Sequence, residues 1–213
     1  MAPALPSRPF LYPIVDVDAL AGRSPGAAVT ALARGGARLL QLRAKGVADR
    51  RLLDLAREAV RAARAAGVAL LLNDRPDVAR LVGAHGVHVG QDDLPPRACR
   101  ALLGSDAIVG LSTHTLEQLA AAAGEPVDYL AVGPVFPTGS KAAPDPVVGL
   151  DLVRRARALT ARSLVAIGGI TPTNAREVVA AGADGLAVIS GVLSASDLTA
   201  AARRFGAVLE GAS

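Results

Sequence analysis

The amino-acid sequence predicts a single α/β domain in which eight parallel strands alternate with helices and close into a (β/α)8, or TIM, barrel. Three observations lead to this prediction. Eight short apolar runs recur along the 213 residues, helical patterns separate them, and glycine ends most of these patterns. Parallel strands joined by helical crossovers form either an open doubly wound sheet or a closed barrel. Eight units in this length favour the barrel, at the compact end of its size range.

The predicted strands are short apolar runs, typical of parallel strands that are buried on both faces. They occupy residues 11–16, 39–43, 69–73, 86–90, 108–112, 129–133, 164–168 and 185–190. The clearest helix between them covers residues 48–66, where apolar side chains recur at spacings of three and four. Its opposite face is rich in arginine, and the Asp54–Arg57 and Glu58–Arg61 spacings predict ion pairs on a solvated surface.

One domain accounts for the whole chain. Because no linker rich in proline, glycine and serine divides it, we expect residues 1–10 to form a frayed lead-in and residues 11–213 to form the barrel. The longest irregular segment, residues 136–148, contains three prolines. We interpret it as a mobile loop over one end of the barrel.

The composition excludes several classes of protein. The single cysteine rules out an intrachain disulfide scaffold, and no apolar run approaches the roughly 20 residues of a membrane-spanning helix. The net charge is +4, but the basic residues are dispersed and aromatic residues make up only 2%. We therefore expect neither a nucleic-acid nor a membrane partner. The start of the chain lacks an apolar signal core, so we expect a cytoplasmic protein. The oligomeric state is left open, and a homo-oligomer is allowed.

Polar residues at the carboxyl ends of the predicted strands are the candidates for chemistry, because barrel enzymes place their sites there. After the second strand, Gln41, Arg43 and Lys45 occupy alternate positions and therefore point to one side. Lys45 and Lys141 are the only lysines among 23 basic residues. An ammonium group suits a phosphate oxygen, which indicates an anionic ligand. A solvated strand end is the alternative.

Acidic residues follow the third and fourth strands. Asn73 and Asp74 come directly after three leucines, and Asp93 follows the strand at 86–90. Two carboxylates from adjacent strand ends would suit Mg²⁺, which prefers oxygen ligands and bridges to phosphates. Each aspartate could instead cap the helix that follows it.

Histidine and hydroxyl groups mark the fourth and fifth strands. His88 lies between two valines, and we interpret it as a hydrogen-bonded core residue. Ser112, Thr113 and His114 end the fifth strand, where they could bind a ligand. Ser112 or Thr113 could instead cap the next helix. A Ser–His–Asp triad is disfavoured, because the G-x-S-x-G pattern of the nucleophile elbow is missing here.

The last three strands end in glycine and hydroxyl residues. Residues 138–141 form a hydroxyl–glycine–hydroxyl–lysine cluster that resembles an anion-binding turn. Gly168, Gly169 and residues 189–191 follow strands seven and eight, where such barrels often hold a phosphate on backbone N–H groups. Ordinary turn glycines are the alternative. Together the strand ends predict two anion sites at one mouth, and therefore two phosphorylated substrates.

Seven motifs in this order resemble the thiamine phosphate synthase (thiamine-phosphate pyrophosphorylase) family, over about Leu11 to Phe205. They are QLRAK, LLLNDRPDVA, GVHVGQDDL, GLSTHT, GPVFPTGSK, VAIGGITP and GADGLAVIS. The resemblance implies a transferase of thiamine biosynthesis that joins 4-amino-2-methyl-5-hydroxymethylpyrimidine diphosphate to a thiazole phosphate. The products would be thiamine phosphate and pyrophosphate, and Mg²⁺ would be required.

The resemblance also assigns roles to residues of this chain. The residues implied to bind the pyrimidine diphosphate are Gln41, Leu42, Arg43, Ala44, Lys45, Asn73, Ser112 and Lys141. Those implied to hold the thiazole phosphate are Thr138, Gly139, Ser140, Gly169, Ile189 and Ser190. Asp74 and Asp93 would bind Mg²⁺, and the catalytic set would be Arg43, Lys45, Lys141 and Ser112. Ser140 departs from the threonine that the family pattern leads us to expect, keeping the hydroxyl and losing a methyl group.

The implied reaction needs no protein nucleophile. An aminopyrimidine can delocalise positive charge, so we expect pyrophosphate to depart through a dissociative, cation-like transition state. The departing charge would be stabilised by Mg²⁺ and the basic side chains. The thiazole nitrogen would then attack, and holding it in position is the remaining task.

Three other functions on the same fold compete with this one. A related thiazole tautomerase, an isomerase, generally lacks the Asn-Asp pair and carries a histidine where this chain has Pro134. A non-catalytic regulator of the thiamine pathway would be expected to lose the carboxylates or lysines, and none is lost. An unrelated phosphosugar isomerase or epimerase would need a pair of acid–base carboxylates and has no use for a second cationic cluster.

Overall fold

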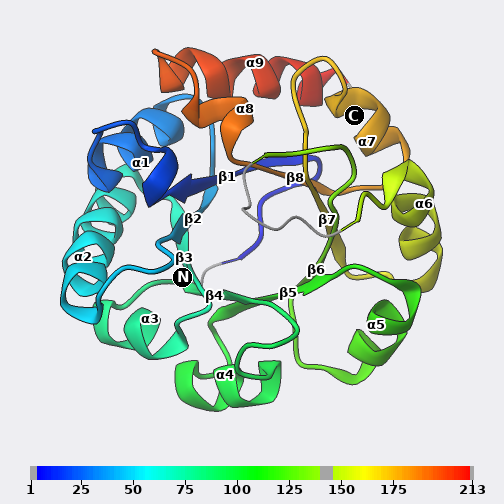
Figure 1. The fold of residues 1–213 in the computed structure, drawn as a ribbon, viewed down its shortest axis with the longest axis horizontal. Coiled ribbons are helices and arrows are strands. Elements are labelled where there is room, and N and C mark those ends of the chain that lie inside the picture. Colours follow the sequence, from blue (N-terminus) through cyan, green and yellow to red (C-terminus); the bar gives the residue numbers. More distant parts are fainter. Residues whose placement is uncertain (1–3, 140–145, 212–213) are drawn as a thin grey trace.

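The computed structural model describes residues 4–139 and 146–211, and it confirms the predicted (β/α)8 barrel (Figure 1). Eight parallel strands pair in sequence order and β8 returns to β1, which closes the barrel. The strands are β1 Phe10–Asp16, β2 Leu39–Arg43, β3 Ala69–Asn73, β4 Gly86–Val89, β5 Ile108–Thr113, β6 Tyr129–Val132, β7 Ser163–Ile167 and β8 Gly185–Val188. Every predicted apolar run therefore coincides with a strand to within two residues at either end.

Helices surround the barrel and cover its outer face (Figure 1). They are η1 Val17–Ala19, α1 Pro25–Arg34, α2 Asp49–Ala66, α3 Pro76–Val82, α4 Pro96–Leu103, α5 Leu116–Ala121, η2 Ala122–Gly124, α6 Gly149–Leu159, α7 Ala175–Ala180, α8 Ser190–Leu193 and α9 Leu198–Glu210. The glycine stops act as expected after α2 and α3, because Gly67 and Gly83 cap these helices with φ of 66° and 65°. Within the described part of the chain, none of the helices is long and apolar enough to cross a membrane.

The strands are buried on both sides, and two hydrophobic cores result. The outer core lies between strands and helices and consists mainly of leucine, valine and alanine. The inner core fills the barrel and includes Phe10, Tyr12, Ile14 and Tyr129. The two tyrosine rings meet edge to face with centroids 5.8 Å apart. A Cβ at Gly110 would lie 2.0 Å from the Tyr129 ring, so glycine in β5 makes room for this aromatic side chain.

The lead-in is not frayed over its described part. Leu5 packs against the inner core. Arg8 donates from Nη2 to Ser163 Oγ at 3.0 Å and pairs through Nη1 with Asp184 at 3.3 Å. Residue 10 already belongs to β1. Hydrophobic contact and an ion pair thus fasten residues 5–8 under the amino ends of the strands, which the polar and proline-rich sequence did not reveal.

The basic face of α2 forms one of its two predicted ion pairs. Arg57 Nη1 lies 3.9 Å from Asp54 Oδ1, and both side chains are exposed. Glu58 turns to α1 instead of to Arg61, and its Oε1 accepts a hydrogen bond from the Gly26 N–H at 3.1 Å. An orphan N–H at the start of α1 is a better partner than an exposed guanidinium that water already solvates.

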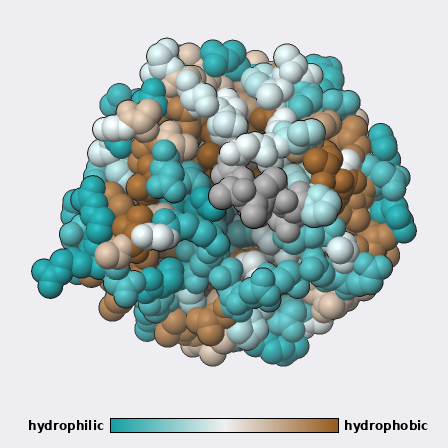
Figure 2. Space-filling model, viewed as in Figure 1, coloured by the Kyte–Doolittle hydropathy of each residue, from teal (hydrophilic) through white to brown (hydrophobic). Residues whose placement is uncertain are grey.

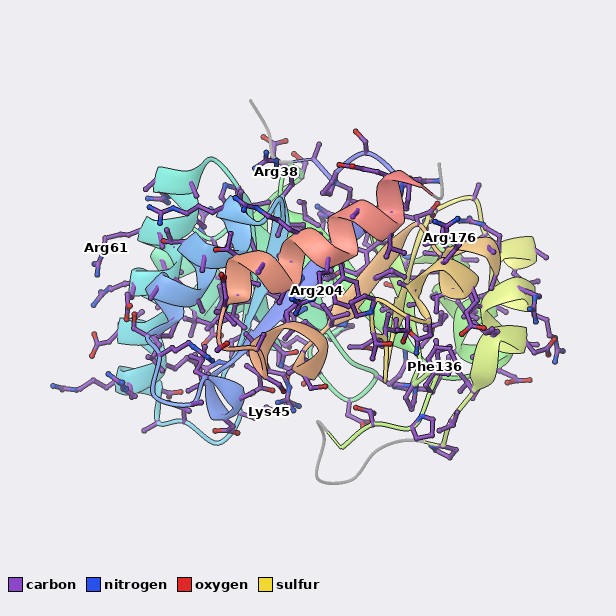
Figure 3. All side chains as sticks on the ribbon, turned by 90° about the horizontal axis from the view of Figure 1, so that it is seen from above. Arg38, Lys45, Arg61, Phe136, Arg176 and Arg204 are labelled. Carbon is purple, nitrogen blue, oxygen red and sulfur yellow. The ribbon has the colours of Figure 1, made fainter. Side chains whose placement is uncertain are left out.

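The two ends of the barrel differ in what they carry. Lys45 and Phe136 lie at one end, while Arg38 and Arg176 lie at or toward the other (Figure 3). On the face that carries Lys45, hydrophilic residues gather over the centre of the barrel (Figure 2). This is the end where the strands terminate, and it is where the candidate site lies.

Candidate active site

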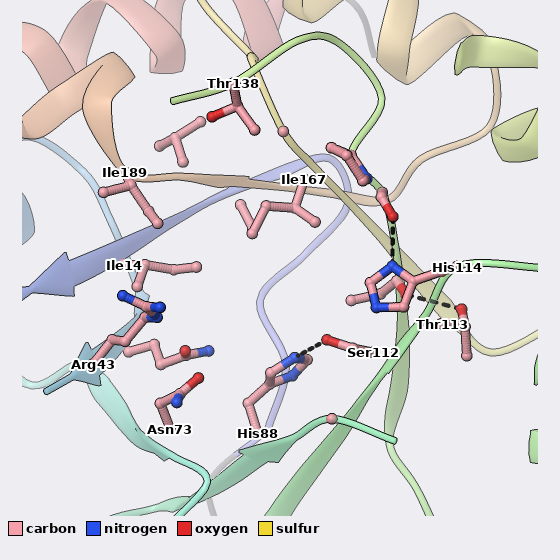
Figure 4. A pocket seen from close by; sticks show the side chains of 18 of the residues that line it. Ile14, Arg43, Asn73, His88, Ser112, Thr113, His114, Thr138, Ile167 and Ile189 are labelled. Atoms are coloured by element: carbon pink, nitrogen blue, oxygen red, sulfur yellow. Dashed lines mark hydrogen bonds between the residues drawn. The ribbon is translucent and has the colours of Figure 1, made fainter. Parts of the chain in front are cut away.

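A cavity of about 460 Å³ opens at the carboxyl ends of the strands, and all eight strands contribute to its lining. Such a volume suits a small-molecule ligand. The sequence-predicted residues that the structure brings together here are Gln41, Arg43, Lys45, Asn73, Asp74, Asp93, Ser112, Thr138, Gly169, Ile189 and Ser190. Figure 4 labels Arg43, Asn73, Ser112, Thr138 and Ile189 among them. Residues from distant parts of the sequence thus meet because parallel strands end at the same side of the barrel.

Three of the predicted residues that the structure describes are not found in this lining. Leu42 is buried among the outer core, and Ala44 packs against that core from outside the strand. Gly139 is exposed beyond Thr138. Ser140 and Lys141 lie outside the residues that the structure describes. The alternation along β2 explains Leu42, because its neighbours Gln41 and Arg43 point into the barrel.

Arg43 is held in place by a carboxylate that the sequence analysis did not single out. Its Nη1 donates to Asp16 Oδ2 at the end of β1, and only 3% of Asp16 is exposed. Asp16 Oδ1 also accepts from the Asp18 N–H at 3.2 Å. The charge of Asp16 is thus satisfied and the guanidinium is aimed at the cavity. The sequence feature that could have identified Asp16 is its position as the one acidic residue at the end of an apolar strand.

Lys45 and the two predicted metal ligands form a second charged group. Lys45 Nζ lies 2.9 Å from Asp74 Oδ2. Asp74 adopts a left-handed backbone with φ of 62°, and its N–H donates to the His88 carbonyl at 2.8 Å. Asp93 Oδ2 accepts from the Gly90 N–H at 2.7 Å. Burial raises the pKa of Asp93 and the neighbouring Asp74 carboxylate raises it further, so the two carboxylates face one another.

Neither aspartate caps a helix. The residue before α3 is Arg75 and the residue before α4 is Pro95, and neither cap position makes a side-chain bond. The capping alternative for Asp74 and Asp93 is therefore wrong. Asp74 lies two residues before the start of α3 and Asp93 lies three residues before the start of α4, and both line the cavity.

The chemistry of this pair fits Mg²⁺. Two carboxylates supply hard oxygen atoms, and Mg²⁺ commonly takes one or two of them together with waters and substrate phosphates. Among the described residues, no three of the types His, Cys, Asp and Glu gather where they could hold a metal ion. A closed, all-protein cage is thus absent from that part of the chain, and the remaining ligands would come from solvent and substrate.

The interior of the cavity carries a run of hydrogen bonds. Gln41 Nε2 donates to the Tyr12 hydroxyl at 2.8 Å, and the two tyrosine hydroxyls lie 2.9 Å apart. His88 bonds through Nδ1 to the Tyr129 hydroxyl and through Nε2 to Ser112 Oγ, both at 2.8 Å (Figure 4). The expectation of a hydrogen-bonded His88 is confirmed. Its placement in the core is wrong, because the side chain lines the cavity.

The end of β5 positions three further side chains. Ser112 bonds to His88, Thr113 donates to the Ala131 carbonyl at 2.9 Å, and His114 Nδ1 lies 2.7 Å from the Gly133 carbonyl oxygen. The cap of α5 is Thr115, so the capping alternative for Ser112 and Thr113 is wrong. The Ser–His–Asp triad, which the sequence disfavours, gains no support, since Nδ1 of His88 bonds to the Tyr129 hydroxyl.

Gln91, which the sequence left without a role, also belongs to this wall. Its Nε2 donates to the Ser112 carbonyl at 2.6 Å, and its side chain lines the cavity. Asp92, Gln118 and Pro134 line the cavity as well. Their positions depend on turns between strands and helices, whose path the strand pattern does not predict.

The glycines after β7 are required by close packing. Gly168 and Gly169 have φ of 104° and 61°. A Cβ on Gly168 would lie 2.5 Å from Pro134, and one on Gly169 would lie 2.5 Å from the Pro137 carbonyl oxygen. The β7 turn thus packs directly on the segment after β6, which carries Thr138. This contact brings hydroxyl groups and backbone from three strand ends to one side of the cavity.

The fold and the cavity define a (β/α)8-barrel enzyme with a small-molecule site at the carboxyl ends of its strands. A family model described as thiamine monophosphate synthase matches residues 11–192. The chain belongs to this family.

Individual relatives agree with that assignment. A thiamine-phosphate synthase of Koribacter versatilis is 52% identical over 87% of this chain and 89% of its own length. One of Chloroflexus aurantiacus is 44% identical over 93% of this chain and 92% of its own. Among solved structures, a thiamine phosphate pyrophosphorylase of Pyrococcus furiosus superposes with a TM-score of 0.85 and 32% identity, covering 96% of each chain.

Proposed function

We propose that this protein condenses 4-amino-2-methyl-5-hydroxymethylpyrimidine diphosphate with a thiazole phosphate to give thiamine phosphate and pyrophosphate, with Mg²⁺. Membership of the family supports an enzyme of thiamine phosphate formation. The observation that carries the finer proposal is the division of one cavity into two sides. Cations and carboxylates from β2, β3 and β4 face a side built from glycine turns and hydroxyl groups after β6, β7 and β8.

The charged side is suited to the diphosphate. Arg43 is held by Asp16, so its guanidinium can meet a diphosphate oxygen without being reoriented at each turnover. Lys45 is 57% exposed at the rim, where its ammonium can follow the departing pyrophosphate. Lys141, outside the described residues, is proposed to add a third cation. These groups act where negative charge accumulates in the transition state.

Asp74 and Asp93 are the residues that would hold Mg²⁺. When bound there, the ion would neutralise charge on the diphosphate oxygens. Lys45 pairs with Asp74, so its ammonium offsets the charge of one of the two carboxylates. Both aspartates are thus supported by neighbouring groups, Asp93 by the Gly90 N–H and Asp74 by Lys45.

The other side is suited to the phosphate of the thiazole substrate. Thr138, Gly169 and Ser190 line it together, and the glycine allows backbone to approach the ligand closely. Holding this substrate opposite the pyrimidine would place the thiazole nitrogen next to the carbon that loses pyrophosphate. Positioning of this kind supplies much of the rate enhancement of a two-substrate reaction.

The competing isomerase lacks support at two positions. Pro134 lines the cavity where the tautomerase would be expected to carry histidine, and proline cannot transfer a proton. Asp74 and Asp93 both line the cavity, although an isomerase that binds no diphosphate has no need of them.

One assay tests the proposal. The purified protein is incubated with both substrates and Mg²⁺, and thiamine phosphate is followed by conversion to fluorescent thiochrome. We expect product that depends on both substrates and is abolished by EDTA. Folded protein that forms no product but interconverts thiazole phosphate tautomers would point to the isomerase. Binding of thiazole phosphate without either reaction would point to a regulator.

A further inference from the structure

Five polar side chains from β1, β2, β4, β5 and β6 form a hydrogen-bonded chain inside the barrel. It runs from Gln41 to Tyr12, Tyr129, His88 and Ser112, with each donor–acceptor distance between 2.8 and 2.9 Å. Figure 4 shows its last step, in which His88 and Ser112 meet at the wall of the cavity. The first three members are at most 1% exposed, so water does not complete their hydrogen bonding.

Gln41 sets the direction in which hydrogen bonds are donated along this chain. An amide nitrogen has only hydrogens to offer, so Gln41 Nε2 donates and the Tyr12 oxygen accepts. Within the described residues, the other partner of the Tyr12 hydroxyl is Tyr129. Leaving a buried hydroxyl hydrogen unpaired is costly, and Tyr12 therefore donates to Tyr129. Burial raises the pKa of both tyrosines, so both hydroxyl groups keep their hydrogens.

The same reasoning extends to the cavity. Tyr129 accepts from Tyr12, so its own hydrogen is donated to Nδ1 of His88. An imidazole whose Nδ1 accepts carries its hydrogen on Nε2, and that nitrogen donates to Ser112 Oγ. The hydrogen of Ser112 cannot also lie on this bond. It is available to a ligand, because Ser112 lines the cavity.

We propose that Tyr12 and Tyr129 are positioning residues that hold His88 in its Nε2–H tautomer, and that Ser112 consequently donates a hydrogen bond to the bound substrate. The identity of that substrate rests on the function proposed above. The acceptor is a ring nitrogen of the aminopyrimidine, because Ser112 and Gln41 belong to the interior of the cavity. The exposed ammonium of Lys45 is at the rim, where the diphosphate is placed.

The opposite direction has a distinct consequence. It requires the Gln41 carbonyl oxygen, in place of Nε2, to face Tyr12. Each bond of the chain then reverses, the His88 hydrogen moves to Nδ1, and Ser112 donates to His88. Ser112 would then present only lone pairs to the substrate and would recognise its amino group. The tautomer of His88 therefore separates the two directions.

Nitrogen NMR of the imidazole reads this tautomer directly. The sequence contains three histidines, so ¹⁵N-histidine labelling gives a spectrum that single-histidine variants can assign. The couplings between ring nitrogens and ring protons distinguish Nε2–H from Nδ1–H. We expect Nε2–H for His88 in the protein without substrates. A Nδ1–H signature would overturn the proposal whatever the enzyme's activity.

Two tyrosine variants then test which hydroxyl sets the tautomer. Tyr129→Phe removes the donor to Nδ1, and we expect mixed tautomers and a roughly tenfold rise in KM for the pyrimidine diphosphate. Tyr12→Phe leaves Tyr129 able to donate, so the tautomer should persist and KM should change less than about threefold. In both, KM for the thiazole phosphate should stay unchanged. Ser163→Ala is the control, because it deletes a buried hydroxyl at the opposite end of the barrel.

Variants of His88 supply a rescue test. The side-chain amide of Gln places a nitrogen donor about where Nε2 lies, so His88→Gln should keep KM closer to the wild-type value than His88→Leu does. The proposal would be overturned if KM rose equally in His88→Gln and His88→Leu, or if the His88 tautomer were unchanged in Tyr129→Phe. The five hydrogen-bonded side chains would then serve packing alone. A wild-type protein that forms no thiamine phosphate would contradict the proposed function, while the NMR result would still decide the tautomer.

Discussion

Arg43 illustrates how a single charged side chain is prepared for binding. Its partner Asp16 is 3% exposed, so the ion pair is shielded from water on the carboxylate side and is stronger than a surface pair. The guanidinium keeps the rest of its N–H groups for a ligand. Burying the Asp16 carboxylate carries a desolvation penalty, which its bonds to Arg43 and to the Asp18 N–H offset.

Asp16→Asn should therefore impair activity through Arg43. The amide keeps the shape of the side chain and removes its charge, so the guanidinium loses its anchor. We expect kcat/KM for the pyrimidine diphosphate to fall by roughly tenfold or more. Asp54→Asn is the matched control, because Asp54 pairs with Arg57 at 3.9 Å on an exposed helix face. Steady-state kinetics on both variants decide the matter, and normal kinetics for Asp16→Asn would remove Asp16 from the site.

The carboxylate pair leads to a second prediction at this scale. Asp93→Asn leaves the Gly90 N–H a neutral acceptor and removes one negative charge from the proposed metal site. The Mg²⁺ concentration for half-maximal activity should rise by roughly tenfold or more, because affinity follows the charge of the ligand set. Asp77→Asn, on an exposed surface pair with Arg75, is the control. If titration with Mg²⁺ gave the same midpoint in Asp93→Asn and wild type, Asp93 would have no part in metal binding.

At the scale of elements, the turn after β7 couples two loops. Gly169 packs on the segment at 136–138 so closely that a methyl group would overlap both the Phe136 side chain and the Pro137 carbonyl. The turn and the segment therefore pack directly on one another, and Thr138 of this segment lines the cavity.

Gly169→Ala should weaken binding of the thiazole phosphate. The methyl group would displace the segment at 136–138, and we expect KM for that substrate to rise and unfolding to become easier by about 1–3 kcal/mol. Gly67→Ala is a matched control, since Gly67 has φ of 66° with open space around its Cα. It should cost about 1 kcal/mol from backbone strain alone and leave KM unchanged. Equal effects of the two substitutions on KM would contradict the coupling.

At the scale of the whole molecule, one hydrogen-bonding arrangement recurs around the barrel. The side chain of the residue just before a strand accepts a hydrogen bond from a backbone N–H of a preceding strand. The residue before β6, Asp128, accepts the Val109 N–H at 2.7 Å, and the residue before β8, Asp184, accepts the Leu164 N–H at 2.9 Å. Arginines from α4 and α6 pair with these aspartates, each at 2.8 Å. Before β4 the same position is held by His85, whose Nδ1 accepts the Leu70 N–H at 3.1 Å.

The histidine makes this one position sensitive to pH. Burial lowers the pKa of His85, and the positive charge of Arg64 lowers it further. A lowered pKa in the folded state means that the unfolded chain binds the proton more readily. The contribution of His85 to stability is thus complete above its unfolded pKa of about 6.5 and is lost as pH falls below that value.

His85→Asp should remove this pH sensitivity, because it places before β4 the aspartate acceptor that is found before β6 and β8. A carboxylate accepts the Leu70 N–H and stays charged beside Arg64 well below pH 6. Between pH 8 and pH 5 the variant should lose about 1 kcal/mol less stability than the wild type. Urea unfolding at both pH values measures the difference. His85→Asn, a neutral acceptor that does not titrate, should behave like His85→Asp, and a loss equal to wild type in both would contradict this role.

Local chemistry explains why the sequence was a good guide to part of the site. Gln41, Arg43, Asn73 and Ser112 end apolar strands, and strand alternation alone predicts that they point inward. Asp74 and Asp93 were recognised as site candidates, yet their capping alternative could be excluded only from the helix starts at Pro76 and Pro96. Asp16 and Tyr129 were missed as partners, because each contact joins side chains of two different strands.

The sequence by itself determined the barrel and the strand ends that form its mouth. The eight apolar runs, the helical spacing of apolar residues between them and the glycines that end the helices can each be recognised within a short segment of the chain. Tertiary structure alone decided the partners: Asp16 for Arg43, Tyr129 for His88, and residues 136–138 for Gly169. It also decided that the lead-in is fastened by Arg8 and Leu5. Distances across a closed barrel depend on strand register and side-chain packing together, and neither is encoded within any one segment.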